Sequence, residues 1–330
     1  MTTSLSPPSA ATSAVHALHG QTMGTTWSVQ YTSRARIEAH ALHDAVQARL
    51  DQVVAQMSTW EADTDIMRFN RLPPGAWFPL QDDVLKVLGA ALDVAAASGG
   101  AFDPTVSPLV AAWGFGAYAL PRGRPADRDL VEARARVGWQ HLRLDPEQRR
   151  VLQPGGITLD LSAIAKGYGV DVVADLLRRR GIDAALIEVG GELYGYGRKA
   201  EGQPWRVLVE SSPDEEADSE GLEPRVLALD GIAVATSGDR WHAYVQDGRR
   251  YSHTIDPRSG EPVTDAAAAV TVIAPDAMHA DAWATALTVM GATAGHAFAA
   301  SNGLAARFLQ RTADGLQETM TPAFERHLAA

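Results

Sequence analysis

Two hard oxygen ligands lie one turn apart in an otherwise apolar stretch, AMHADAWATALTVMG at residues 277–291. At about 100° per residue, this spacing predicts one helix with large apolar side chains, Trp283 among them, on one side. Asp281, Thr285 and Thr288 fall on the other side. A carboxylate and a hydroxyl one turn apart suit Mg²⁺ or Ca²⁺. Alternatively, the threonines are structural and donate to the carbonyl four residues earlier.

Lys166 lies in a second stretch with chemical potential, ITLDLSAIAKGYGVDVVADLLRRRG at residues 157–181. The pattern predicts a strand followed by a helix that Ser162 caps. Lys166 falls in the first helical turn, where an ammonium and free backbone N–H groups together attract an anion. The alternative is a surface lysine paired with Asp171 or another neighbour. The two glycines after the lysine each cost the helix about 1 kcal/mol relative to alanine, so a close contact is expected there.

His253 is the candidate acid or base. It lies at a predicted strand end, just before a tight turn, DPRSG at residues 256–260. An imidazole there can accept or donate a proton near neutral pH. A structural role is the alternative. The patterns GxxxxGK[ST] and GxGxxG between a strand and a helix are absent, so a nucleotide needs a metal or another cradle.

The composition restricts the class of protein. The 330 residues carry 29 basic and 40 acidic side chains, a formal net charge of −11, which argues against a nucleic-acid surface. An anionic ligand therefore needs a local device such as a lysine, a helix N-terminus or a cation. The absence of cysteine excludes disulfides, thiolate metal sites and a cysteine nucleophile. No segment reaches the roughly 18 apolar residues of a membrane helix, so no membrane span is expected.

The elements that would position these residues are typical of an α+β protein. Apolar periodicity predicts helices over 36–57, 82–97, 162–180 and 277–290. Short strands are predicted over 22–31, 184–198, 205–210, 225–236, 242–246, 249–255, 268–274 and 305–310, with QDG at 246–248 as a hairpin turn. Solvated loops are predicted over 121–129 and over the acidic segment 211–224. This order indicates sheets packed on helices and not a regular βα alternation.

Eight segments, in this order along the chain, resemble the ApbE family of flavin transferases. They are QTMGTTW, MSTWEADTDIMRFN, AFDPTVSPLVAAWGFG, LDLSAIAKGYGVD, EVGGELYGYG, ATSGDRWHAY, SHTIDPRSGEPV and HADAWATALTVMG. The resemblance covers roughly residues 20–310, nearly the whole globular part of the chain.

The resemblance implies a compact α+β fold of two lobes, with mixed or antiparallel sheets packed on helices and FAD in the cleft between the lobes. It implies Mg²⁺-dependent transfer of FMN from FAD to a threonine or serine hydroxyl of a target flavoprotein, which forms a phosphoester and releases AMP. Ca²⁺ is an alternative cation. Two other functions stay open: a Mg²⁺-dependent FAD pyrophosphatase that yields FMN and AMP, and a non-catalytic FAD-binding protein.

The resemblance also assigns roles to residues. Positions that match the family's motifs imply flavin contacts from Met23, Trp60, Ala101, Phe102, Asp103, Asp160, Lys166, Thr236, Ser237, Gly238 and Ile255. The family's metal ligands correspond to the backbone oxygen of Ala163 and the side chains of Asp281 and Thr285. The metal and Lys166 would neutralise charge on the attacked phosphorus and on the departing AMP.

Two further residues receive expected roles in the reaction. His253 is the candidate that activates the incoming hydroxyl, and Asp160 would hold a metal-bound water or orient Lys166. Trp60 stands where relatives often carry tyrosine, so aromatic stacking is retained.

The chain is expected to divide into a disordered leader at 1–19, one flavin transferase domain at 20–320 and a C-terminal tail at 321–330. Many relatives are exported lipoproteins anchored through a cysteine. This chain shows neither that cysteine nor a recognisable signal, which favours the cytoplasm, with the periplasm as the alternative.

Overall fold

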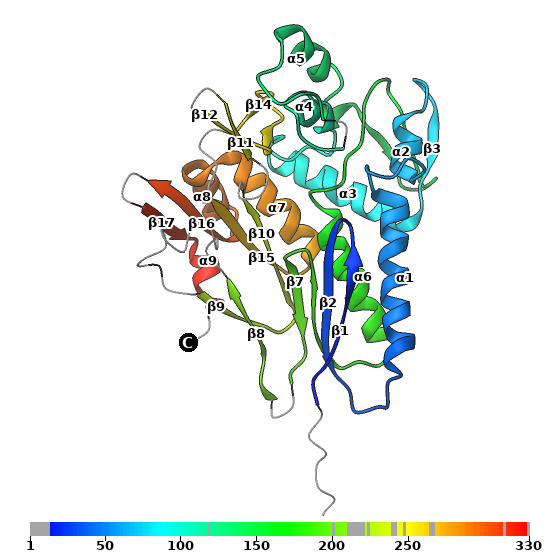
Figure 1. Cartoon of the computed structure of the whole chain (residues 1–330), viewed down its shortest axis with the longest axis vertical. Helices are drawn as coiled ribbons and strands as arrows, with labels where there is room; N and C mark the ends of the chain where they lie inside the picture. The colour runs from blue at the N-terminus through cyan, green and yellow to red at the C-terminus, as the bar shows by residue number, and fades with distance from the viewer. Residues whose placement is uncertain are drawn as a thin grey trace, which may run out of the picture.

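An eight-stranded antiparallel sheet is the central element of the computed structural model (Figure 1). Its strand order is β1-β2-β6-β7-β10-β15-β16-β17, and each neighbouring pair is antiparallel. The strands are β1 (His16–Thr22), β2 (Thr25–Thr32), β6 (Ala184–Val189), β7 (Glu192–Tyr196), β10 (Ile232–Gly238), β15 (Ala269–Ala274), β16 (Ala305–Thr312) and β17 (Gly315–Met320). The structure describes residues 14–117, 119–199, 202–209, 222, 225–238, 243–246, 249–263, 268–312 and 315–328.

Helices cover one face of this sheet. Because side chains alternate along a strand, Trp27, Val29 and Tyr31 of β2 all point to that face, where they are buried. They pack against apolar stripes of α1 and α6, and α3 packs behind these helices and against α7. The helices on this side are α1 (Ala39–Met57), α3 (Asp82–Ala97), α6 (Ala165–Arg179), α7 (Ala277–Met290) and α8 (Ala292–Ser301).

The opposite face is covered by a hairpin and a short helix. These are β8 (Trp205–Val209), β9 (Arg225–Leu229) and α9 (Pro322–Glu325). Trp205, Leu229 and Phe324 form a cluster there with Val234 of β10 and Ile273 of β15. Both faces of the central sheet are therefore buried over these strands, which fixes the strand register.

The remaining elements gather mainly beyond one end of the sheet, at the top and upper right of Figure 1. They include three small sheets, with strand orders β3-β5-β4, β11-β12 and β13-β14. Their bounds are α2 (Asp65–Asn70), β3 (Trp77–Pro79), α4 (Ser107–Ala112), α5 (Asp127–Arg134), η1 (Trp139–His141), β4 (Arg143–Asp145), β5 (Arg150–Leu152), β11 (Ala243–Gln246), β12 (Arg249–Ser252), β13 (Ile255–Asp256) and β14 (Glu261–Pro262). The predicted α+β class is confirmed, and the sheets are antiparallel.

The predicted helices are confirmed, and those at 82–97 and 277–290 have the predicted bounds. The prediction that Ser162 caps the helix of Lys166 is wrong. That helix, α6, begins at Ala165, and its N-cap residue is Ile164, whose side chain makes no capping hydrogen bond. The Asp160 carboxylate instead accepts the N–H of Ser162 at 2.9 Å, which makes a turn before the helix.

Two long predicted strands are each two strands: β6 and β7 pair as a hairpin, whereas β9 and β10 belong to different sheets. Residues 184–198 contain β6 and β7, and 225–236 contain β9 and the start of β10, because glycine-containing turns interrupt each run. The predicted strand at 249–255 ends at Ser252, before His253. The loop predicted at 121–129 ends early, since α5 begins at Asp127.

The expected leader and the expected C-terminal tail both include residues that belong to the folded part of the chain. Strand β1 begins at His16, whose ring stacks on Tyr31 of β2 at 5.2 Å, so the end of the predicted leader belongs to the sheet. The predicted tail begins with α9, and Phe324 in that helix is fully buried. Residues 1–13 and most of the acidic segment 211–224 lie outside the described residues, as does the tip of the QDG turn. None of the described helices combines the length and apolar character needed to span a bilayer.

Replacing Phe324 with alanine tests whether the C-terminal segment is part of the core. Phe324 is fully buried beside Trp205 and Leu229, so Phe324→Ala should lower the free energy of unfolding by about 3–5 kcal/mol. The matched control is Glu325→Ala on the exposed side of the same helix, which should change it by less than about 0.5 kcal/mol. Urea unfolding followed by circular dichroism measures both values. Equal stability of the two variants would contradict the packing of α9.

Candidate functional site

The two helices that carry the predicted charged residues cross with almost no space between them. A Cβ atom added to Gly167 of α6 would lie 2.1 Å from the carbonyl oxygen of Ala277 in α7, so only glycine fits there. The start of α7 is fixed to α6 by Asp171, whose carboxylate accepts the N–H groups of Ala277 at 2.8 Å and Met278 at 3.0 Å. Asp171 therefore caps α7, and the alternative in which it pairs with Lys166 is wrong.

This crossing places Asp281 at the N-terminus of α6. Its Oδ2 atom accepts the N–H of Gly167 at 3.1 Å, and only 5 % of the residue is exposed. A carboxylate is stabilised by the positive end of a helix dipole. Asp281 of α7, the predicted metal ligand, thus bonds the residue that follows Lys166 in α6. The amino-acid sequence alone could not show this contact.

Lys166 pairs with a second buried acid. Its ammonium donates to Oε1 of Glu192, the first residue of β7. The Glu192 side chain is 2 % exposed and that of Lys166 is 32 % exposed. The stem of Lys166 lies against the β6–β7 turn, since a Cβ added to Gly190 would be 3.4 Å from its Cδ. Lys166, Glu192 and Asp281 are called the charged cluster below.

Burial and mutual attraction oppose each other in the charged cluster. Burial raises the pKa of Glu192 and of Asp281, because a carboxylate loses its hydration, while the ammonium of Lys166 acts in the opposite direction. Burial alone would lower the pKa of Lys166, but the charges of Asp281 and Glu192 outweigh it and raise this pKa. Because burial raises the pKa of both carboxyl groups, a proton or a cation at the charged cluster would offset the negative charge that Lys166 leaves unbalanced.

The residue types of the predicted metal ligands are compatible with a divalent cation, although no group of three or more His, Cys, Asp or Glu side chains that could hold a metal occurs among the described residues. Oε2 of Glu192 is buried without a hydrogen-bond partner among the described residues, so a ligand that supplied a partner there would stabilise it. The Thr285 side chain lies one turn beyond Asp281 and is half-buried. Ala163 lies in the turn that Asp160 shapes before α6. These groups are hard oxygen donors, as Mg²⁺ prefers.

One of the two threonines on the polar side of α7 has a structural role, as the alternative interpretation predicts. Thr288 is fully buried and donates to the carbonyl oxygen of Ala284, four residues earlier, at 2.8 Å. Among the described residues the Thr285 hydroxyl has no such partner, which separates it from Thr288.

Several residues predicted to contact flavin lie next to α6. Met23, at the β1–β2 turn with a φ of 50°, would be 3.1 Å from a Cβ added to Gly169. Residues 101–103 are buried, and Pro104 beyond them accepts the N–H of Asp160 at 2.8 Å. The Asp103 carboxylate accepts hydrogen bonds from Thr105 and from the N–H of Trp139, and these bonds stabilise the loop that contains Asp103.

Other predicted flavin contacts lie on different elements. Trp60 is 73 % exposed in the loop between α1 and α2. Thr236, Ser237 and Gly238 form the end of β10, and the hydroxyl of Thr236 bonds that of Thr271 across the strand pair at 3.0 Å. No described contact joins Trp60 to the charged cluster.

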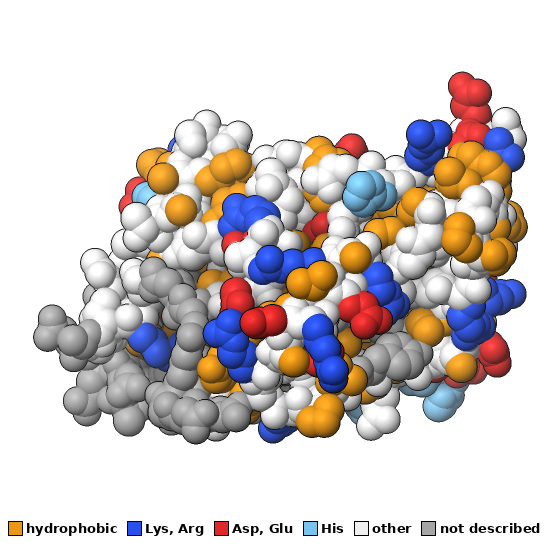
Figure 2. Space-filling view, turned by 90° about the horizontal axis from the view of Figure 1, so that it is seen from above, with side chains coloured by type: hydrophobic (Ala, Val, Ile, Leu, Met, Phe, Trp, Pro, Cys, Tyr) orange, Lys and Arg blue, Asp and Glu red, His pale blue; other side chains and the backbone are white. Residues whose placement is uncertain are grey.

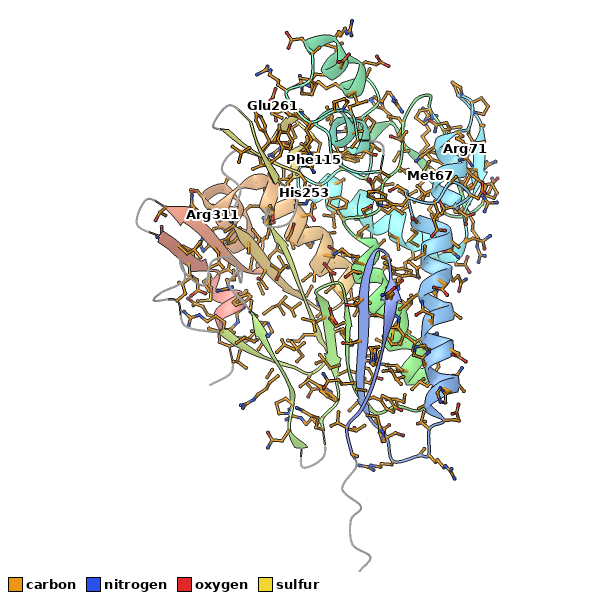
Figure 3. All side chains as sticks on the ribbon, viewed as in Figure 1. Met67, Arg71, Phe115, His253, Glu261 and Arg311 are labelled. Atoms are coloured by element: carbon orange, nitrogen blue, oxygen red, sulfur yellow. The ribbon has the colours of Figure 1, made fainter. Side chains whose placement is uncertain are left out.

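His253 belongs to an aromatic region beside α4. Its ring meets that of Phe115 edge-on at 6.4 Å, and Figure 3 shows the two residues close to each other. Tyr244 and Tyr251 of that hairpin stack at 5.2 Å. Ile255, two residues beyond His253, is buried in the same region. The candidate base is therefore held by a different part of the chain from Lys166.

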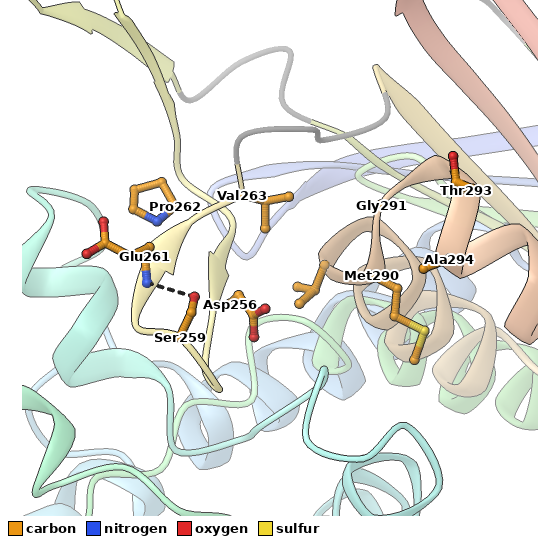
Figure 4. A pocket seen from close by; sticks show the side chains of 10 residues that line it. Asp256, Ser259, Glu261, Pro262, Val263, Met290, Gly291, Thr293 and Ala294 are labelled. Atoms are coloured by element: carbon orange, nitrogen blue, oxygen red, sulfur yellow. Dashed lines mark hydrogen bonds between the residues drawn. The ribbon is translucent and has the colours of Figure 1, made fainter.

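A cavity of about 360 Å³ lies between the β13–β14 turn and the α7–α8 junction (Figure 4). Asp256, Ser259, Met290 and Gly291 are among its lining residues. Met290 follows Asp281 by nine residues, about 13 Å along a helix axis, so this cavity is separate from the charged cluster.

The face of the molecule seen from above (Figure 2) carries charged side chains of both signs. Figure 2, seen from above, shows basic and acidic side chains interspersed on that face, with hydrophobic side chains between them. A local ammonium, a helix N-terminus and a cation are therefore the means by which a negatively charged ligand would bind.

Sequence reasoning missed Glu192 and the capping role of Asp171. A signal for Glu192 was present, since alternation places it in phase with Tyr194 and Tyr196, both buried. A charged residue in a buried phase, directly after two glycines, indicates a paired acid. Asp171 had no such signal, because its partners are 106 and 107 positions away along the chain.

Comparisons with known proteins agree on one family. The sequence profile of the ApbE family matches residues 23–308. A protein of Klebsiella pneumoniae (strain 342) named FAD:protein FMN transferase is 36% identical over 99% of this chain and 92% of its own length. A protein of Vibrio cholerae with the same name is 38% identical over 94% of this chain and 92% of its own.

Solved structures agree with the sequence comparisons. The apo form of the flavinyl transferase ApbE of Pseudomonas stutzeri superposes with a TM-score of 0.88 at 40% identity, covering 96% of this chain and 98% of its own. The flavin transferase ApbE of Vibrio cholerae superposes with a TM-score of 0.87 at 36% identity, covering 96% and 100%.

Two glycines of α6 provide a test of the helix crossing. Gly167→Ala should lower the free energy of unfolding by about 1–3 kcal/mol, because the added Cβ meets the backbone of Ala277. Gly169→Ala is the matched control. Its Cβ would meet only the flexible ends of Met23 and Leu50, at 3.1 and 3.3 Å, and alanine favours the helix by about 1 kcal/mol. Urea unfolding should therefore give Gly169→Ala a clearly higher free energy of unfolding than Gly167→Ala. The reverse order would refute the close crossing.

Proposed function

The chain belongs to the ApbE family, and from this premise we propose that it transfers FMN from FAD to a threonine or serine hydroxyl of a target flavoprotein. The observation that carries the proposal is the charged cluster at the crossing of α6 and α7. It combines an ammonium, a helix N-terminus and a buried carboxylate, the means of binding a pyrophosphate inside a protein with a net charge of −11.

The proposed cation is Mg²⁺, held by the side chains of Asp281 and Thr285 and the backbone oxygen of Ala163. Bound there, it would act as a Lewis acid toward a phosphoryl oxygen. Lys166 contributes a fixed positive charge at the start of α6, where charge builds up during phosphoryl transfer. The α6 N–H groups add to that field.

The reaction forms one bond and breaks another. The acceptor oxygen attacks the phosphorus of the FMN half of FAD, and the bond from that phosphorus to the oxygen of AMP breaks. His253 is the proposed base that takes the hydroxyl proton. The edge of Phe115 against the imidazole restricts its orientation. Asp160 contributes indirectly, by shaping the turn that carries Ala163.

The same residues would serve an FAD pyrophosphatase, since only the attacking oxygen differs. The transferase is favoured here by the names of relatives that match along nearly their whole length. A non-catalytic flavin carrier would gain nothing from the buried charges of Asp281 and Glu192, which are costly to fold.

Replacing Asp281 with asparagine tests the site. Asparagine can still accept the N–H of Gly167, so the fold should persist while the charge that binds the cation is lost. FMN transfer should fall by at least about 100-fold, the scale of losing one electrostatic group at a phosphoryl or acyl transfer site. The measurement is the mass gain of an acceptor protein incubated with FAD and Mg²⁺, with AMP and free FMN followed in parallel.

The matched control is Asp175→Asn on the exposed side of α6, which should keep parental activity. Full activity of Asp281→Asn at limiting Mg²⁺ would refute the metal assignment. Release of FMN and AMP by the parent protein, without labelling of any acceptor tested, would favour the pyrophosphatase. Intact FAD throughout would favour the carrier.

A further inference from the structure

Lys166 has two carboxylates close enough to attract it, and the structure shows which one it binds. The ammonium donates to Glu192, while Asp281 accepts the backbone N–H of Gly167. Both acids act on the lysine electrostatically. The two carboxylates therefore have different partners, although each could serve as the counter-ion of the same ammonium.

This division matters for a cation site. An ammonium bound directly to Asp281 would neutralise the carboxylate that the cation needs and would occupy the space beside it. With the ammonium donating to Glu192, the only hydrogen bond given for the Asp281 carboxylate among the described residues is the one from the N–H of Gly167, and Lys166 acts on it through space. The position of Lys166 thus decides whether Asp281 is available.

Glu192 is held firmly enough to fix that position. It is the first residue of β7, paired with Val189 across the β6–β7 turn, in the middle of the eight-stranded sheet. Its side chain is almost fully buried. Gly190 in the turn has a φ of 60°, and a Cβ there would lie 2.7 Å from Thr25, so β2 closes over the turn. The lysine stem rests on this rigid turn and its head on Glu192.

We propose that Glu192 is a positioning residue that holds the ammonium of Lys166 away from Asp281 and so leaves Asp281 available to a divalent cation. The proposal rests on the proposed function, because it takes the cation site from there. Lys166 then acts beside the cation instead of replacing it, which lets both positive charges face the same phosphate groups.

Metal binding provides a test that needs no turnover. Mn²⁺ is the probe, and the loss of its free paramagnetic resonance signal measures binding to the full chain, with and without FAD. Glu192→Gln leaves a neutral amide, so Lys166 should move to Asp281 and the affinity for Mn²⁺ should fall about tenfold or more. The control is Glu188→Gln in the same hairpin, whose carboxylate bonds Ser28 and the N–H of Gly191. It removes the same charge without touching Lys166 and should leave Mn²⁺ affinity within about twofold.

A second background separates positioning from simple loss of negative charge. With Lys166→Met there is no ammonium to move, so adding Glu192→Gln should change Mn²⁺ affinity by less than about twofold. An equal loss of affinity in both backgrounds would mean that Glu192 acts only through its charge and would overturn the proposal. So would an unchanged affinity in Glu192→Gln alone.

Activity supplies an independent readout. In Glu192→Gln the Mg²⁺ concentration that gives half-maximal FMN transfer should rise about tenfold, while the rate at saturating Mg²⁺ stays within about threefold of the parent. If Glu192→Gln does not fold, Glu192→Asp replaces it. That variant keeps the charge and should retain at least about a third of the parental Mn²⁺ affinity, and a loss as large as that of Asp281→Asn would overturn the proposal.

The two proposals fail differently. A parent protein that binds Mn²⁺ and transfers FMN, with Glu192→Gln unchanged in both, refutes the role of Glu192 alone. A parent protein that binds Mn²⁺ but transfers no FMN refutes the proposed function and leaves the metal-binding comparison decisive for Glu192. A parent protein that binds no Mn²⁺ with or without FAD refutes the cation site and both proposals with it.

Discussion

The close crossing of α6 and α7 at Gly167 is the constraint on which the site depends. Only a residue without a side chain allows the backbone of Ala277 to approach so near. That approach brings Asp281 onto the N-terminus of α6, and the cap that Asp171 provides holds the start of α7 in place. A glycine that weakens its own helix is thereby what makes the contact between two helices possible.

The charges at this crossing are arranged locally and not by the protein as a whole. The chain is acidic overall, and the view in Figure 2 shows both signs interspersed. Two buried carboxylates and one ammonium would be a poor way to stabilise a fold, since their desolvation offsets most of their attraction. Their presence together at a helix N-terminus is what the proposed function requires, since a cation and phosphate groups would bring charges of both signs.

The central sheet gives this cluster its rigidity. Helices cover one face, and the β8–β9 hairpin with α9 covers the other, so β7 cannot shift without disturbing two buried layers. Glu192 takes its position from that strand, and Lys166 takes its position from Glu192. His253, by contrast, belongs to a small hairpin region packed on α4. The charged cluster and the candidate base His253 thus lie on different elements, which pack in different apolar clusters.

The sequence by itself determined the family, the fold class and the helices with strong apolar periodicity, such as 82–97 and 277–290, because these depend on local patterns and on the order of motifs. It also identified Lys166 and Asp281 as candidate site residues, because an ammonium and a carboxylate have known ligand preferences. Only the tertiary structure decided their partners. Ser162 does not cap the helix because α6 begins at Ala165, after the turn that Asp160 makes with the N–H of Ser162, and Lys166 pairs with Glu192 instead of Asp171. Pairing between segments distant in the chain depends on how helices and strands pack, and no local pattern of residues encodes it.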